Sequence, residues 1–342
     1  MKIGIVGYQG AGKSSLFRWL TGVEPDPSLA HTNQMANTPI IDPRVERLCE
    51  IYQPKKVTHA MLNLVDTPGL GRDQEGNASK LAAIREVGCL VVVVAAYSGT
   101  DVAAELAAFE DDLLLADLEI VTGRVERLRE SVKKPRPNRD RELAELQTLE
   151  PILEQLEQGK AMRELELDDS ATRAVKSFQL LTEKPRFVII NVAEDETEPE
   201  RFLEPLPDPD HSIPLAVTLQ WELAQMPEDE RTEFCNEMGV QQIDRDDVVR
   251  RLMHASGQML FFTAGDKEVR TWLIRQGATA EEAAGSIHTD LARGFVRAET
   301  MTCDDLFRLG SEREVKAQNL MRKEHKEYII QDGDILHILS NV

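Results

Sequence analysis

The chain has 342 residues, of which 42% are hydrophobic, and it carries a formal net charge of −20. This length predicts two or three domains, and the apolar content argues against a largely disordered chain. A negative field of this size repels nucleic acid backbones and anionic membranes, so neither DNA nor a membrane is expected as a partner. No stretch approaches the about 18 apolar residues of a membrane span. The four cysteines form no CxxC pair and predict free thiols in a reducing cytoplasm.

Strand-like and helix-like segments alternate over the first hundred residues. Residues 14–20 follow a glycine-rich stretch and are typical of the start of a helix. Short apolar runs that are typical of buried parallel strands lie at 3–6, 61–65, 89–95 and 186–190. Strands that alternate with helices predict an α/β fold with a doubly wound, mostly parallel sheet.

The region from 102 to 178 has a different pattern. Apolar residues recur every three or four positions from Leu115 to Val132 and again from Leu143 to Leu156. Two prolines interrupt the pattern between these stretches. The sequence therefore predicts two amphipathic helices in an antiparallel hairpin. Such a hairpin is either a purely structural element or an arm that binds a partner. The sequence pattern does not distinguish these alternatives.

The C-terminal region returns to strand-like runs. Two hairpins are predicted, one pairing 259–262 with 269–274 and the other pairing 328–330 with 335–339 across the turn at 332–334. Thr279 is expected to cap a helix, because its hydroxyl can accept from a free N–H group of the first turn. A small mixed sheet with one helix across it is the predicted result.

These patterns together predict three domains. A nucleotide-binding G domain is expected to comprise residues 1–101 and 183–256, with the helical arm inserted at 102–182. Residues 257–342 are expected to form a third, C-terminal domain.

Residues 7–14 match the phosphate-binding loop motif G-x-x-x-x-G-K-[ST], between a predicted strand and a predicted helix. The glycines let backbone N–H groups approach phosphate oxygens closely, at the positive end of a helix. Lys13 is expected to contact the β- and γ-phosphates, and Ser14 is expected to offer its hydroxyl to Mg²⁺. The loop residues predicted to bind nucleotide are Gly7, Gly10, Ala11, Gly12, Lys13, Ser14 and Ser15.

A second motif, D-x-x-G, occupies residues 66–69 after a predicted strand. Asp66 can hold the Mg²⁺ shell, and the N–H of Gly69 can sense the γ-phosphate. Catalytic roles are therefore predicted for Lys13, Asp66 and Gly69. The predicted metal-binding residues are Ser14, Thr32 and Asp66, with Thr38 as the alternative to Thr32.

The nucleotide base is expected at Asn191, Val192 and Glu194. Guanine-specific P-loop proteins have N-K-x-D here, in which the Asp accepts from guanine and the Lys stem covers the base. This chain has Val and the longer Glu at those two positions. ATP is therefore the predicted nucleotide, and GTP is the alternative.

Leu70 follows the D-x-x-G motif, where many small GTPases have a glutamine that orients the attacking water. A leucine cannot do this. Water must then be aligned by another group or by a partner, or hydrolysis must be slow.

With these motifs, the chain resembles the YchF family of Obg-related P-loop ATPases over its whole length. Beyond the P-loop, the similar stretches are 42–44, 54–56, 84–86, 114–119, 191–194, 261–265, 268–270, 277–279, 287–290 and 294–298. The resemblance implies a C-terminal β-grasp domain of the TGS type, a coiled-coil arm and a preference for ATP. It also implies association with ribosomes or RNA, through the TGS domain and the arm.

Two residue differences from the family pattern bear on hydrolysis. Gly10 stands where the family usually has an asparagine that is linked to a monovalent cation, and the loop at 97–100 lacks the family's histidine. Three functions therefore stay open: a slow Mg²⁺-dependent ATPase switch, the same switch using GTP, and a nucleotide-sensing scaffold with negligible turnover. The ATPase switch is the leading hypothesis.

Overall fold

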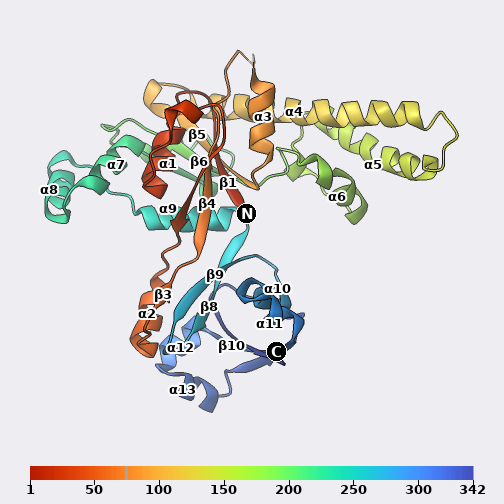
Figure 1. Cartoon of the computed structure of the whole chain (residues 1–342). Helices are drawn as coiled ribbons and strands as arrows, with labels where there is room; N and C mark the ends of the chain where they lie inside the picture. Colours follow the sequence, from red (N-terminus) through yellow and green to blue (C-terminus); the bar gives the residue numbers. More distant parts are fainter. Residues whose placement is uncertain (74–75, 342) are drawn as a thin grey trace. The chain divides into compact units, whose positions relative to one another are not determined.

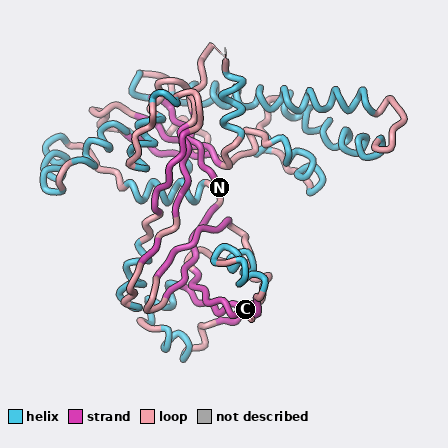
Figure 2. Tube along the Cα trace, in the orientation of Figure 1, coloured by secondary structure: helices cyan, strands magenta, loops and turns pink. Residues whose placement is uncertain are grey.

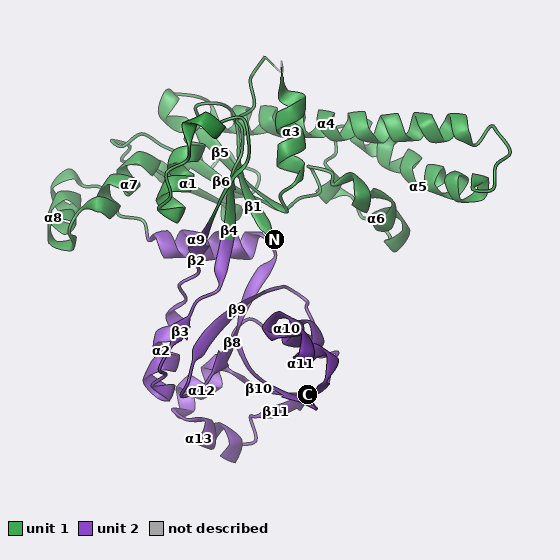
Figure 3. Cartoon of the chain, viewed as in Figure 1, with its two compact units in different colours: residues 1–36, 63–243 green, residues 37–62, 244–342 purple. Residues whose placement is uncertain are grey.

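The computed structural model describes residues 1–73 and 76–341. The chain divides into two compact units (Figure 3), residues 1–36 with 63–243 and residues 37–62 with 244–342. The first unit includes the predicted arm, and the second adds residues 37–62 and 244–256 to the C-terminal region. The three-domain division drawn from the sequence stays a prediction. No helix among the described residues is long and apolar enough to cross a membrane.

A six-stranded sheet forms the centre of the first unit, in the order β2-β4-β1-β5-β6-β7 (Figure 2). Its strands are β1 (Lys2–Val6), β2 (Gln34–Pro39), β4 (Met61–Asp66), β5 (Cys89–Ala95), β6 (Arg186–Asn191) and β7 (Ser212–Leu215). The neighbouring pairs from β4 to β7 are all parallel. Every residue of β5 is buried, as expected for a strand that is covered on both faces. The predicted α/β fold with a mostly parallel sheet is confirmed.

Helices connect these strands or follow the last of them in the chain. They are α1 (Lys13–Thr21), α3 (Asn77–Arg85), α7 (Val217–Gln225) and α8 (Glu228–Met238). Helix α1 packs against α7. The core beside β5 joins residues of the sheet to Val102, Leu106 and Phe109 at the start of the next long helix.

The predicted helical hairpin is confirmed as α4 (Val102–Ser131) and α5 (Arg139–Glu157), which run side by side (Figure 1). Apolar residues at three- and four-residue spacing form their shared core, together with α6 (Asp169–Val175). On the outer side, Arg124 forms an ion pair with Glu145 at 2.7 Å. The hairpin has its own core, so α4 continues beyond the sheet as a regular helix.

The second unit contains a mixed sheet in the order β11-β10-β12-β8-β9-β3. Its strands are β3 (Val57–Thr58), β8 (Gln258–Ala264), β9 (Val269–Arg275), β10 (Phe295–Thr302), β11 (Arg322–Glu324) and β12 (Asp334–Ser340). Its helices are α2 (Pro43–Tyr52), α9 (Arg245–Ala255), α10 (Ala280–Ile287), α11 (Thr289–Arg293), α12 (Cys303–Leu309) and α13 (Glu312–Ala317). Strands β8 and β9 form the predicted antiparallel hairpin.

Two features of the C-terminal prediction are tested by local hydrogen bonds. Thr279 caps α10 in a reciprocal capping box with Glu282, as predicted.

The second predicted hairpin is wrong, because β12 pairs with β10 and β8 instead. Residues 328–330 form no strand. The Asp334 carboxylate accepts from the Tyr328 hydroxyl and the Gln331 N–H, which fixes this segment as a loop. The expectation of one helix is also wrong, since α11, α12 and α13 follow α10.

Candidate nucleotide-binding site

The phosphate-binding loop connects β1 to α1. Gly12 has φ of 98°, which favours glycine, and a Cβ there would lie 2.3 Å from Asn191 Nδ2. The Asn191 side chain donates to Ala11 O at 3.0 Å and accepts from the Val217 N–H at 3.2 Å. Asn191 therefore fastens the loop to the start of α7. Both of its polar atoms are bonded to backbone.

Lys13 is the first residue of α1, at the end of the loop. Its side chain is only 7% exposed, and its ammonium group donates to Tyr8 O at 2.8 Å. Burial lowers its pKa to about 8, against an opposing effect of the Asp66 carboxylate, while the positive charge of Lys80 lowers it further. Gly69 approaches closely, since a Cβ at that residue would lie 2.6 Å from Lys13 Nζ. The glycine of the D-x-x-G motif therefore lies beside the P-loop lysine.

Ser14 and Asp66 also come together. The Ser14 hydroxyl donates to Asp66 Oδ2 at 2.7 Å, at the carboxyl end of β4. Burial raises the pKa of Asp66, although the Ser14 hydrogen bond and the Lys13 charge lower it. Within the described part of the chain, the buried Asp66 Oδ1 has no hydrogen-bond partner. A hydroxyl and an unsatisfied carboxylate oxygen fit Mg²⁺, a hard cation that prefers oxygen ligands. Ser14 and Asp66 would hold this ion, whose charge would offset that of the phosphates.

The two threonines predicted as alternative metal ligands lie in different environments. Thr32 follows the short helical turn η1 (Pro27–Leu29), is exposed and donates to Leu29 O at 3.0 Å. Thr32 lines the same cavity as Lys13 and Asp66, whereas Thr38 is buried in β2 and does not line it.

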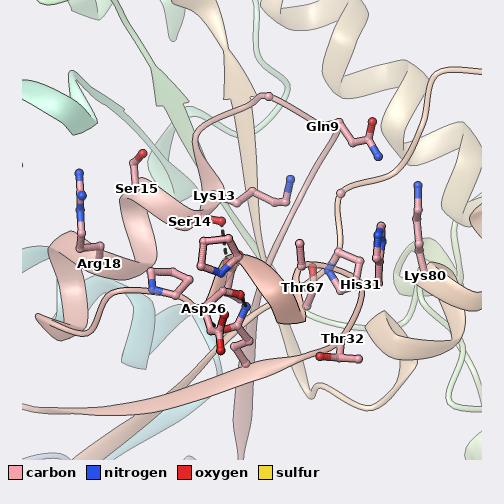
Figure 4. Close-up of a pocket in the computed structure, with 18 of the residues that line it drawn as sticks. Gln9, Lys13, Ser14, Ser15, Arg18, Asp26, His31, Thr32, Thr67 and Lys80 are labelled. Carbon is pink, nitrogen blue, oxygen red and sulfur yellow. Dashed lines mark hydrogen bonds between the residues drawn. The ribbon is translucent and has the colours of Figure 1, made fainter.

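A cavity of about 470 Å³ opens beside the loop (Figure 4). It contains several charged and polar residues that the sequence motifs did not indicate. These are Gln9, Arg18, Glu24, Asp26, His31, Gln34 and Lys80. Gln9 occupies a position that the P-loop motif leaves open. The other residues lie outside both motifs, and only their place in the same cavity as Lys13 identifies them.

Two further hollows connect the loop to the predicted base-binding residues. The first is lined by Gly12, Ser15, Tyr97, Asn191 and Thr218. The second is lined by residues 191–195 and Thr218, so it includes the predicted Val192 and Glu194. Tyr97 and Thr218 were missed by the sequence interpretation, although both follow the carboxyl end of a strand, where α/β folds bind ligands.

Leu70 is fully buried, and its backbone is bonded on both sides to the P-loop. Gln9 N donates to Leu70 O at 3.0 Å, and Leu70 N donates to Gly7 O at 3.1 Å. The Leu70 side chain packs in the core with Val6 and Val65. It therefore faces away from the cavity and cannot orient water.

A parallel sheet with this loop, a buried lysine and a serine–aspartate pair at the strand ends defines a P-loop nucleoside triphosphatase. Residues 2–122 match the family described as "50S ribosome-binding GTPase" (MMR_HSR1), and residues 259–341 match YchF-GTPase_C, described as "Protein of unknown function (DUF933)".

Curated relatives match the chain from end to end. "Ribosome-binding ATPase YchF" of Haemophilus ducreyi is 34% identical over 100% of this chain and 99% of its own length. The protein of that name from Bacillus subtilis is 32% identical over 99% of each chain. "Obg-like ATPase 1" of Oryza sativa subsp. japonica is 33% identical over 100% of this chain and 92% of its own.

A solved structure extends the match to three dimensions. The "Schizosaccharomyces pombe YchF GTPase" superposes with a TM-score of 0.83, at 27% identity, over 99% of this chain and 97% of that one. The chain belongs to the YchF family.

Proposed function

We propose that the chain is a Mg²⁺-dependent switch that prefers ATP and hydrolyses it slowly. The observation that carries this proposal is the series of hollows that runs from Lys13 past Asn191 to Glu194. Lys13, Asp66 and Gly69 act on the γ-phosphate in this proposal. Residues 7 and 10–15 hold the phosphates, and Ser14, Asp66 and Thr32 contact the metal ion.

The base site favours adenine over guanine. Val192 is buried and packs in the core with Val94 and Ile190, so no long side chain covers a base from that position. Glu194 is exposed and lines the hollow. The relatives' printed names, "Ribosome-binding ATPase YchF" and "Obg-like ATPase 1", support the same preference. GTP is the second candidate, because residues 2–122 match a family described as a GTPase.

A fluorescent-nucleotide titration with unlabelled competitors tests the base preference. ATP is expected to displace the probe at lower concentration than GTP. Glu194→Asp shortens the carboxylate to the length found in guanine-specific proteins, and we expect the ATP-to-GTP affinity ratio to fall about tenfold.

The control is Glu200→Asp, the same change at an exposed residue outside the hollow. It is expected to leave the ratio unchanged. Stronger competition by GTP than by ATP in the unmodified protein would contradict the proposed preference.

Removing the proposed metal contact gives a separate prediction. Asp66→Asn is expected to abolish most of the gain in ATP affinity that Mg²⁺ gives over EDTA, because the amide lacks the charge that attracts the ion. Asp210→Asn, at an exposed residue without an ion pair among the described residues, is the control. An undiminished Mg²⁺ effect in Asp66→Asn would argue against this ligand.

A ribosomal partner follows from the relatives' names and is part of the proposal. The helical hairpin α4–α5 and the second unit are the surfaces proposed to contact it, in the cytoplasm, and the assignment of residues 257–342 as a TGS domain belongs to the same proposal. Co-sedimentation with ribosomes in ATP, ADP or no nucleotide tests it, and a nucleotide-dependent difference is expected. Turnover too slow to measure, with binding retained, would instead support the nucleotide-sensing scaffold.

A further inference from the structure

Lys80 reaches the phosphate cavity from a helix that the motifs do not include. It lies in α3 and lines the same cavity as Lys13, Gly69 and Asp66. In the view of Figure 4, Lys80 and His31 lie on the opposite side of Lys13 from Ser15 and Arg18. A second lysine therefore lines the cavity that Lys13 and Gly69 line.

Helix α3 is held firmly at both ends. At its start, the buried Asn77 side chain accepts from the Gly71 N–H and donates to Gly71 O, both at 2.8 Å. Near its end, Arg85 donates to Asp117 at 2.8 Å and to Ala116 O at 3.0 Å. Gly71 follows Leu70, whose backbone is bonded to the P-loop. The helix that carries Lys80 is therefore positioned by the same segment that contains Gly69.

The charge of Lys80 is not neutralised by a described residue. Arg18, another cation that lines the cavity, is paired with Glu24 at 3.0 Å. Lys80 has neither an ion pair nor a hydrogen bond with any described residue. It lies close enough to Lys13 for its positive charge to contribute to the lowered pKa of that lysine. Two ammonium groups that repel each other across a cavity are both stabilised when a polyphosphate enters.

We propose that Lys80 contacts the γ-phosphate and stabilises the charge on its oxygens in the transition state. This inference rests on the proposed nucleotide site. In the reaction, the oxygen of water bonds to the γ-phosphorus, and the bond from that phosphorus to the β–γ bridging oxygen breaks. The electron pair stays on the β-phosphate of the departing diphosphate, and the proton of the water passes to the phosphate product. Lys80 remains protonated and supplies fixed positive charge in a chain whose Leu70 cannot orient the water.

The experiment compares Lys80→Ala and Lys80→Arg with the unmodified full chain in steady-state phosphate release with ATP and Mg²⁺. Alanine is a better helix former than lysine, so Lys80→Ala is expected to fold. We expect kcat to fall about ten- to hundredfold in Lys80→Ala, as for the loss of one preorganised group. Lys80→Arg keeps the charge and is expected to stay within about threefold. Lys176→Ala, which removes an exposed lysine elsewhere in the first unit, is expected to have no effect.

Binding measurements separate this role from a structural one. The affinity of Lys80→Ala for ADP is expected to be unchanged, because ADP lacks the γ-phosphate. Its affinity for ADP with aluminium fluoride, which mimics the transferring phosphate, is expected to fall in parallel with kcat. An equal loss for ADP, or a normal kcat in Lys80→Ala, would overturn the role of Lys80 and leave the nucleotide site intact. Failure of the unmodified chain to bind ATP would overturn both proposals.

Discussion

Replacement of Lys13 by methionine is expected to stabilise the nucleotide-free protein while abolishing its nucleotide binding. Lys13 is only 7% exposed, and its ammonium group donates to the backbone carbonyl of Tyr8. Burial lowers the pKa of Lys13 to about 8 from an ordinary value of 10.5, so the charged form is disfavoured in the folded chain. A shift of this size corresponds to on the order of 3–4 kcal/mol at neutral pH, and methionine avoids this cost with a side chain of similar length.

The pH dependence has a definite sign. Between about pH 8 and pH 10.5 the unfolded chain keeps the proton on Lys13, whereas the folded chain releases it. The unfolded state therefore binds more protons, and the stability of the unmodified protein rises with pH across this window. Below pH 8 Lys13 is charged in both the folded and the unfolded chain, so the full free-energy cost of burying its charge lowers the stability of the folded protein. The advantage of Lys13→Met over the unmodified protein is thus expected to be largest at pH 7 and to shrink towards pH 10.5.

Urea unfolding at pH 7 and pH 9.5, without nucleotide, measures this advantage. Lys176→Met is the matched control, because it makes the same change at an exposed site. In ATP and Mg²⁺ the order is expected to reverse, since only the unmodified protein gains stability from bound nucleotide. A Lys13→Met protein that is less stable than the unmodified one at pH 7 would contradict the electrostatic argument. Retained ATP binding would contradict the assigned role of Lys13 itself.

The phosphate half of the site could be predicted from the sequence because its residues belong to short motifs at strand ends. Lys13, Ser14, Asp66 and Gly69 meet as those motifs require, since the carboxyl ends of neighbouring parallel strands lie at one edge of the sheet. Lys80 could not be predicted in this way. Its position depends on how α3 is anchored, through Asn77 and Arg85, and no spacing along the chain records those contacts.

The base half of the site was predicted less completely. Asn191 occupies the expected position, but its polar atoms bond to Ala11 and Val217, in two segments that are distant in sequence. Val192 is predicted at the base site, and the structure buries its side chain in the core beside the hollow that it lines. Val188, Ile190 and Val192 lie two residues apart and pack in one core, because side chains at alternate positions of an extended chain share a face, which explains the burial of Val192.

Three family-like stretches, 42–44, 84–86 and 114–119, do not line the hollows beside the P-loop, and the structure gives them roles in packing. In the second unit, Asp42 caps α2 and pairs with Arg44, which also pairs with Asp332 at 2.8 Å and lies over the ring of Phe262. In the first unit, Arg85 and Asp117 form an ion pair. The Arg44–Asp332 and Arg85–Asp117 pairs join positions that are 288 and 32 residues apart, which is why the local sequence pattern did not reveal them.

Asp117→Ala is expected to destabilise the first unit by about 3–5 kcal/mol, the usual effect of removing one partner from a buried ion pair. Asp117 is fully buried in α4, and besides Arg85 its carboxylate accepts from the N–H groups of Leu181 and Thr182 and from the Thr182 hydroxyl. Truncation leaves the Arg85 charge and two backbone donors without this acceptor. The base of the helical arm would then lose its connection to α3 and to the segment that returns to β6.

Urea unfolding and amide hydrogen exchange measure the two parts of this prediction. Faster exchange is expected first at Leu181 and Thr182, whose N–H groups lose their acceptor. Asp111→Ala, one and a half turns earlier in α4 and exposed, makes the same substitution without burial and is expected to change stability by less than about 0.5 kcal/mol. Because both changes replace Asp by Ala within one helix, their difference isolates the buried network from helix propensity. Equal effects of the two substitutions would show that the carboxylate of Asp117 does not hold the arm to the nucleotide-binding sheet.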